Sequence, residues 1–123
     1  MTLYTYVQTM KVIQARKKYS VTYPDLYAPH GHKNKKEFDC VQRAHQNMLE
    51  NMPSVAIQTL CCGIMYPLFA AACCGIWSLG RISYVVGYST GNPSKRQFGG
   101  ILAHFGDMPL MIATFVVAYK MIA

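Results

Sequence analysis

The hydrophobic residues of this chain lie in long blocks and do not alternate with polar residues. Residues 55–66 and 68–88 are almost continuously apolar and are separated by Pro67. Residues 105–123 form a third block that only two charged side chains interrupt. A helix needs about 20 predominantly apolar residues to cross the hydrocarbon core of a bilayer. Because residues 68–88 alone meet that length, the pattern predicts an all-α membrane protein.

Turn signals divide the chain into four predicted helices. The first helix is the weakest span, because barely fifteen residues precede Arg16 and cover only about 22 Å. Pro53 is expected to kink the second helix, and Pro67 leaves room only for a tight antiparallel turn. The expected fold is a single domain, residues 1–123, built as a four-helix transmembrane bundle with a shortened first helix. The predicted helices span about residues 2–18, 37–65, 68–88 and 98–122.

The charged residues are few, and most of the cations lie in two clusters, residues 11–36 and residues 95–96. Only 14% of the residues are charged, against about 25% in an average soluble domain. The net charge is +7, and with four helices the first and third connections carry the loop cations while the turn at Pro67 carries none. Lys and Arg concentrate in loops on the cytosolic side of membranes, so these loops are expected on a cytosolic or matrix side. No groove-reading motif accompanies the charge, which argues against a nucleic-acid partner.

Polar and ionisable residues recur on one face of each of the two central helices, next to the basic loops. They stand at i, i+4 and i+7 on the second helix, and at i, i+3 and i+7 on the third. Ionisable groups placed in or near a membrane are costly and by default indicate a functional site. The six residues are Arg43, Asn47 and Glu50, and Arg81, Tyr84 and Tyr88.

This mixture of side chains suits a ligand that combines carboxylates, an ammonium group and amides. Arg43 would bind a carboxylate through its guanidinium fork, Glu50 would bind the ammonium, and Asn47 would bind peptide groups. Glutathione offers all of these together with a thiol. Arg96, Arg16 or a tyrosine hydroxyl would stabilise its thiolate. The residues therefore predict a glutathione site without a metal.

Simpler interpretations of the same residues remain open. Arg43 and Glu50 would also serve as surface ion pairs, and Tyr84 and Tyr88 as aromatic residues at the membrane interface. The paired cysteines inside the apolar blocks are expected to be packing residues. His30 and His32 lack a third ligand in the sequence and give only a weak metal signal.

Four strings in the chain resemble the MAPEG superfamily, the small membrane proteins of glutathione and eicosanoid metabolism. Within it they are most similar to the microsomal glutathione S-transferase type 3 members. The resemblance covers roughly residues 15–100 in order and spacing. The strings are residues 15–19 with Tyr23-Pro24 after them; residues 40–47 continuing to Glu50; Gly80-Arg81 leading to Tyr84 and Gly87-Tyr88; and Thr90-Gly91 followed by residues 93–96.

The resemblance implies a four-helix subunit that assembles as a homotrimer in the endoplasmic reticulum or another organellar membrane, such as a mitochondrial one. It implies glutathione bound between subunits near the cytosolic side, and conjugation to lipophilic electrophiles or reduction of lipid hydroperoxides. Arg96, or alternatively Lys95, matches the thiol-activating position, with Tyr84 beside it; Arg16 and His45 match contacts from a neighbouring subunit. The glutathione contacts implied on one subunit are Arg43, Asn47, Glu50, Tyr84 and Tyr88.

Departures from the family pattern keep other functions open. The first helix is shorter than in relatives, and Asn51 stands where some relatives have tyrosine. A shortened relative would serve as a non-catalytic accessory subunit of a larger membrane complex, such as a mitochondrial one. A third alternative is a lipid-binding scaffold that keeps the site without chemistry.

Overall fold

The structure, a computed structural model, describes residues 2–123, and the side chains from Leu3 onward. Within this range it is all-helical, which confirms the four predicted helices. The largest difference lies at the start of the second helix, which begins at Lys35 and not near Glu37. The elements are α1 (Thr2–Tyr19), α2 (Lys35–Met65), α3 (Pro67–Tyr88), the short 3₁₀ helix η1 (Pro93–Arg96) and α4 (Gln97–Ile122).

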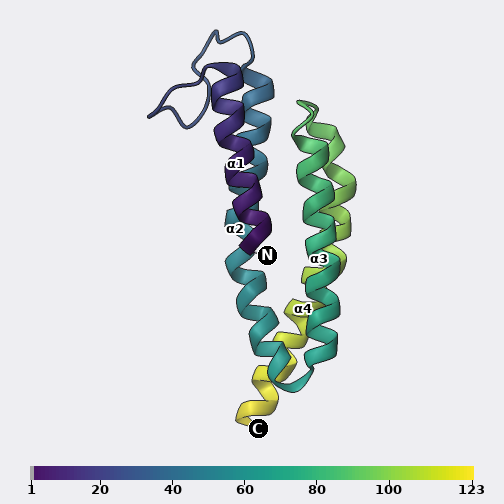
Figure 1. Cartoon of the computed structure of the whole chain (residues 1–123). Coiled ribbons are helices and arrows are strands. Elements are labelled where there is room, and N and C mark those ends of the chain that lie inside the picture. Colours follow the sequence, from purple (N-terminus) through teal and green to yellow (C-terminus); the bar gives the residue numbers. More distant parts are fainter. Residues whose placement is uncertain (1) are drawn as a thin grey trace.

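The four helices form an elongated bundle of two pairs (Figure 1). In this bundle α1 packs along α2, α3 packs most extensively on α4, and α2 contacts both α3 and α4. The α1–α2 loop and the turn that contains η1 lie at one end of the bundle, and the α2–α3 turn lies at the other (Figure 1). The loop cations therefore gather at one end, as predicted; Lys120, near the opposite end, is a helical residue that bonds to Tyr66.

The α2–α3 turn is as tight as the sequence predicts. Only Tyr66 separates the two helices. Its N–H donates to the Cys62 carbonyl at 2.8 Å and its carbonyl accepts from the Ala70 N–H at 3.0 Å, so the turn satisfies its own backbone groups. Pro67 occupies the first turn of α3, where its missing N–H costs no helical hydrogen bond.

Proline also occurs inside two helices. The helical backbone of α2 continues through Pro53, and that of α4 continues through Pro109. Each proline removes one helical hydrogen bond, a loss that neighbouring helices tolerate better than an isolated helix does.

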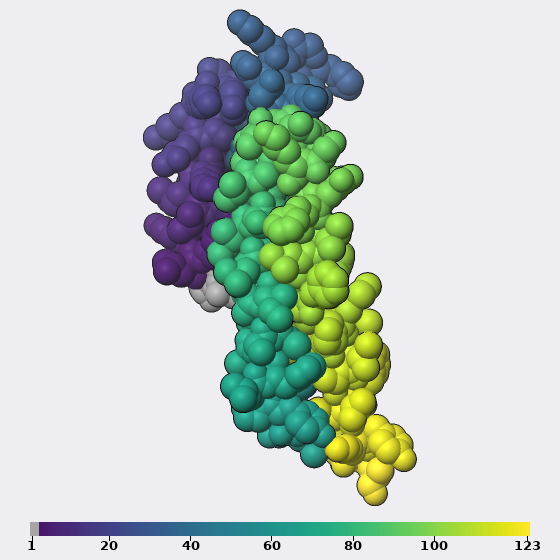
Figure 2. Space-filling view, turned by 90° about the vertical axis from the view of Figure 1, so that its right-hand side faces the viewer, coloured from purple at the N-terminus to yellow at the C-terminus, as the bar shows by residue number. Residues whose placement is uncertain are grey.

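Glycines allow α3 and α4 to lie unusually close, side by side along their length (Figure 2). A Cβ atom on Gly99 would lie 2.1 Å from the backbone nitrogen of Tyr84. A Cβ on Gly80 would lie 2.3 Å from the nitrogen of Ala103. Small residues at such crossings let helix backbones approach in contact, as they do in membrane bundles.

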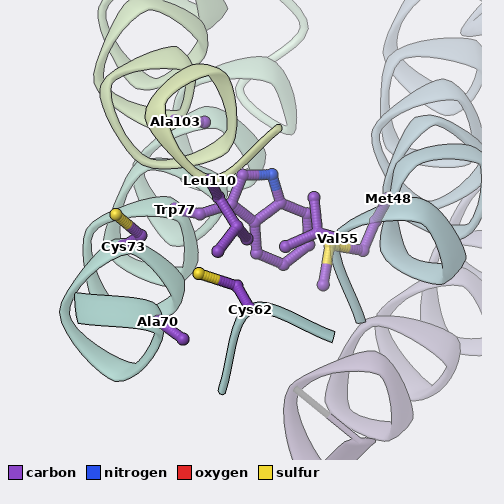
Figure 3. Close-up of a cluster of buried hydrophobic side chains, with 8 residues drawn as sticks. All are labelled: Met48, Val55, Cys62, Ala70, Cys73, Trp77, Ala103 and Leu110. Atoms are coloured by element: carbon purple, nitrogen blue, oxygen red, sulfur yellow. The ribbon is translucent and has the colours of Figure 1, made fainter. Parts of the chain in front are cut away.

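The largest cluster of buried hydrophobic side chains is built around Trp77, which is 1% exposed (Figure 3). Side chains from α2, α3 and α4 surround it. Two of the cysteines lie in this cluster as free thiols, in agreement with the packing role predicted for them. The cluster consists of Met48, Val55, Cys62, Ala70, Cys73, Trp77, Ala103 and Leu110.

The outer surface of α3 and α4 is strongly apolar. In the part of the chain that the structure describes, two stretches are long and apolar enough to cross a membrane, Pro67–Tyr88 and Pro93–Ile122. Only 39% and 22% of the most apolar parts of these two stretches is buried inside the bundle. Large side chains such as Leu68, Phe105 and Phe115 point outward instead. Soluble monomers rarely expose continuous apolar surface of this kind, so these faces are suited to lipid or to other subunits.

Candidate functional site

A polar cavity of about 240 Å³ opens between α2, α3 and α4 in the half of the bundle nearer the basic loops. It brings together residues from the two predicted polar faces, and α4 adds a further wall. Its lining residues are Asn47, Asn51, Arg81, Tyr84, Gly100, Ala103, His104 and Asp107.

Arg81 is the most deeply buried cation of this cavity, with 5% of its surface exposed. Its guanidinium donates to Oδ1 of Asn47 at 2.8 Å and stacks 4.5 Å from the centre of the Tyr84 ring. The carboxylate of Asp107 on α4 also attracts it. Burying an unpaired charge is very costly, so these partners explain how Arg81 is tolerated inside the bundle. They also tie α2 and α3 together at the depth of the cavity.

Two stacked tyrosines connect Arg81 to the basic end of the bundle. The rings of Tyr84 and Tyr88 meet edge to face, with centroids 5.6 Å apart. Arg96 donates to the Tyr88 hydroxyl at 3.0 Å and lies 4.8 Å from its ring centre. A continuous line of contacts therefore runs from Arg96 through both tyrosines to Arg81 and Asn47.

The turn before α4 selects Arg96, and not Lys95, for this line. Gly91 lies in the turn after α3 with φ +81, and the Asn92 side chain caps η1 by accepting from the Ser94 N–H at 3.1 Å. In the resulting 3₁₀ turn the backbone of Lys95 packs against Gly87 and its side chain is exposed. The structure thus distinguishes two neighbours that the sequence left as alternatives.

The other predicted ligand contacts on α2, Arg43 and Glu50, are exposed and are not lining residues of the cavity. Arg43 is exposed; it makes a long hydrogen bond, 3.5 Å, to the hydroxyl of Tyr27 in the α1–α2 loop and also interacts with the Tyr88 hydroxyl. Glu50 is exposed, and the structure records no bonding partner for it among the described residues. Asn51, the residue after it, donates to the Asn47 carbonyl at 2.7 Å. Arg43 and Glu50 are therefore available to a ligand, while Asn47 is held in place.

Arg16 and His45 both lie away from this cavity. Arg16 belongs to α1, and His45 lies on the side of α2 that faces α1. Position 45 is about 200° around the helix from positions 43 and 47, so one chain cannot direct all three side chains to one ligand. Arg16 donates to the Asp25 carbonyl at 2.8 Å and stacks 4.3 Å from the Tyr23 ring centre. His45 lines a narrow gap beside Gln8 and Lys11 of α1.

The structure adds two residues that the sequence analysis did not assign. His104 and Asp107 stand one helical turn apart on α4, and Nδ1 of His104 lies 3.2 Å from both carboxylate oxygens. Two titratable residues at helical spacing within or beside an apolar block are the signal that would have identified them. The sequence places Arg81 on the polar face of α3 but does not indicate a specific role for it.

The loop histidines do not form a metal site with other side chains. Nδ1 of His32 accepts from the backbone N–H of Asn34 at 3.1 Å. Over residues 2–123, no three or more His, Cys, Asp or Glu side chains come together in a way that could hold a metal ion.

Comparison with known protein families agrees with this arrangement. Residues 1–116, almost the whole chain, match the MAPEG family, which includes glutathione transferases and related membrane proteins. The resemblance seen in four short strings therefore extends over all four helices at the level of the family. The chain folds as a four-helix bundle with an apolar exterior and a polar cavity near its basic end. On the match over residues 1–116, it belongs to the MAPEG family.

Proposed function

We propose that this chain is an integral membrane glutathione transferase or peroxidase of the type 3 microsomal kind. The observation that carries the proposal is the unbroken line of contacts from Arg96 through Tyr88, Tyr84 and Arg81 to Asn47. Along this line a cation stands on either side of a pair of phenols, and its inner end lines a cavity. Such a surface complements a tripeptide that has carboxylates at its ends and a thiol in between.

In the proposed complex, exposed charged groups on α2 bind the charged ends of glutathione. Arg43 would exchange its long bond to Tyr27 for a carboxylate, and Glu50 would bind the ammonium group. Asn47 still has amide N–H groups for a peptide carbonyl, because Arg81 uses only its oxygen.

Arg96 and Tyr84 would act on the thiol itself. A thiol with an ordinary pKa near 8.5 ionises more readily beside a cation, and Arg96 is the cation that contacts Tyr88 at the basic end of the tyrosine pair. The resulting thiolate attacks the electrophilic carbon of a lipophilic substrate and displaces its leaving group, or attacks an oxygen of a hydroperoxide. The Tyr84 hydroxyl would donate a hydrogen bond to the thiolate.

The apolar exteriors of α3 and α4 support an integral membrane location. They would admit lipophilic substrates directly from the bilayer. The clustered cations of the α1–α2 loop and η1 favour placing that end on the cytosolic or matrix side of an endoplasmic-reticulum or mitochondrial membrane.

A homotrimer would complete the site. Arg16 and His45 lie on the α1 side of α2, away from the cavity of their own chain. If both contact glutathione, as the family resemblance implies, they must contact the ligand of a neighbouring copy. The proposed site is therefore shared between subunits.

Titration of glutathione into the detergent-purified protein tests the proposal. We expect saturable binding that Arg43→Ala weakens by roughly 10- to 100-fold, the amount expected for one charged hydrogen-bonding partner. Lys36→Ala is the matched control, because Lys36 is an exposed cation on the first turns of the same helix. The mass of the assembly, measured on the same sample, should equal three chains. Absence of binding by the unsubstituted protein would overturn the proposal.

One observation favours a second candidate, a non-catalytic accessory subunit of a larger membrane complex. Arg81 is already hydrogen-bonded to Asn47, and Arg96 to Tyr88, as members of a purely structural network would be. An accessory subunit would copurify with unrelated membrane proteins in fixed stoichiometry and would not bind glutathione.

A further inference from the structure

His104 and Asp107 form an ion-pair motif on a helix that is otherwise almost entirely apolar. Nδ1 of His104 lies 3.2 Å from Oδ1 and from Oδ2 of Asp107. The pair stands about 10–15 Å along α4 from its start, within the stretch long and apolar enough to cross a membrane. A surface pair would add little stability, and ionisable groups in a membrane span are costly, so packing alone does not account for it.

The pair lies where two cavities meet. The first is the cavity of about 240 Å³ that contains Arg81 and Tyr84. The second, of about 220 Å³, lies deeper between α2 and α4, and its walls include Val55, Met108 and Met111. Three residues line both cavities: Asn51, His104 and Asp107. The three shared polar residues thus stand between the cavity beside Tyr84 and a groove whose walls combine Val55, Met108 and Met111 with the polar Ser54 and Gln58.

We propose that this deeper groove binds a lipid hydroperoxide and that His104 donates the proton its reduction requires. The inference rests on the proposed function, because glutathione in the first cavity supplies the thiolate. The apolar chain of the substrate would lie along Val55, Met108 and Met111. Its hydroperoxyl group would lie near Asn51 and His104, where the two cavities join.

The glutathione thiolate attacks the terminal oxygen of the hydroperoxide, an S–O bond forms and the O–O bond breaks. The electron pair of the broken bond leaves on the alkoxide oxygen, which takes a proton from Nε2 of the His104 imidazolium to give the lipid alcohol. The glutathione sulfenic acid then reacts with a second glutathione, which gives the disulfide and water. Two thiols are oxidised and one peroxide is reduced.

The geometry of the pair suits this role. Asp107 occupies Nδ1 of His104, which leaves Nε2 for a substrate, and 61% of the His104 side chain is exposed. The other titratable side chains lining the two cavities are Arg81 and Tyr84 on α3; α2 contributes only uncharged polar and apolar residues. His104 is therefore the side chain in this groove whose free ring nitrogen can carry a proton to the substrate.

Comparison of two reactions of the purified, full-length protein tests the inference. His104→Gln keeps a polar side chain but cannot supply a proton. We expect it to slow glutathione-dependent reduction of a fatty-acid hydroperoxide by roughly 100-fold, the usual contribution of a general acid. Conjugation of a lipophilic aryl halide should change less than threefold, because halide leaves without a proton. His30→Gln, at an exposed loop histidine, is the control and should leave both reactions unchanged.

Asp107 acts through His104 and is a positioning residue. Asp107→Asn should slow hydroperoxide reduction far more than aryl halide conjugation. If Asp107 served only to attract Arg81, the variant would slow both reactions alike. Asp107→Glu, which restores a carboxylate one turn from His104, should recover much of the reduction rate.

The outcomes separate this inference from the proposed function. If the unsubstituted protein binds no glutathione, both fail. If it binds glutathione and reduces hydroperoxide, but His104→Gln reduces it equally fast, only the role of His104 fails. If it conjugates the aryl halide and reduces no hydroperoxide, the groove does not serve the substrate proposed here and the inference is overturned.

Discussion

The guanidinium of Arg81 on α3 donates a 2.8 Å hydrogen bond to Oδ1 of Asn47 on α2, inside the bundle. The contact joins residues 34 positions apart in the chain. It fixes the register of the two helices at the level where the polar cavity opens. Because Arg81 also stacks on Tyr84, the same contact sets the inner end of the proposed glutathione site.

Removal of the Asn47 side chain should destabilise the bundle. Asn47→Ala would leave the buried Arg81 charge without its hydrogen-bonded partner, which is expected to cost about 1–3 kcal/mol in the free energy of unfolding. Denaturant titration of the protein in detergent measures this. Asn47→Asp, which keeps an acceptor oxygen, should retain the stability. Equal stability of all three proteins would show that Arg81 does not depend on Asn47.

The close approach of α3 and α4 predicts different effects at two glycines. Gly99→Ala would place a methyl carbon 2.1 Å from the Tyr84 backbone nitrogen, so the helices must separate. We expect a loss of about 1–3 kcal/mol in stability and weaker glutathione binding, because Tyr84 moves with its backbone.

Gly75→Ala is the matched control for Gly99→Ala, since no atom lies within 4 Å of a Cβ placed at position 75. Alanine is favoured over glycine in helices by up to about 1 kcal/mol, so this variant should be as stable as the parent or more so. A tolerated Gly99→Ala would mean that the two helices do not cross as closely as the structure shows.

Much of this arrangement could be predicted from the sequence, because long apolar blocks and proline or glycine turns determine helices locally. The family was predicted from four strings and is confirmed by the match over residues 1–116. The pairing of Arg81 with Asn47 could not be predicted, since it depends on the register of two helices across a turn of a single residue. The choice between Lys95 and Arg96 likewise depends on η1, whose 3₁₀ geometry has no periodic signal.

Residues of α2 that the family resemblance assigns to two different subunits face opposite sides of that helix in the structure. Arg43, His45 and Asn47 are close in the chain, yet His45 faces α1 while Asn47 faces the cavity. The sequence gives only a weak signal for His104 and Asp107, because apolar residues surround both in the chain. The structure shows which cavities the two side chains line.

Topology provides a prediction that does not depend on catalysis. In a variant whose native cysteines are replaced by alanine, Lys33→Cys and Ser94→Cys should react with a membrane-impermeant maleimide from one side of sealed vesicles. Leu68→Cys, beside the α2–α3 turn, should react only from the other side. All three positions are exposed, and the first two lie at the opposite end of the bundle from the third. Reaction of the first two from different sides would rule out the membrane orientation proposed for the bundle.

Arg96 and Lys95 form the sharpest test of thiol activation, because the two cations are adjacent in the chain and only Arg96 contacts Tyr88. Arg96→Ala should still bind glutathione through Arg43, Asn47 and Glu50, but its thiolate would lose the cation that stabilises it. We expect conjugation of a lipophilic aryl halide to slow on the order of 100-fold, as when one preorganised electrostatic contact is removed. Lys95→Ala should retain the parent rate, since its side chain is exposed and its backbone provides the packing against Gly87. Steady-state rates together with glutathione affinities separate binding from activation. If both variants slow equally, the cations of η1 act through the general field of the basic end, and Arg96 has no specific role at the thiol.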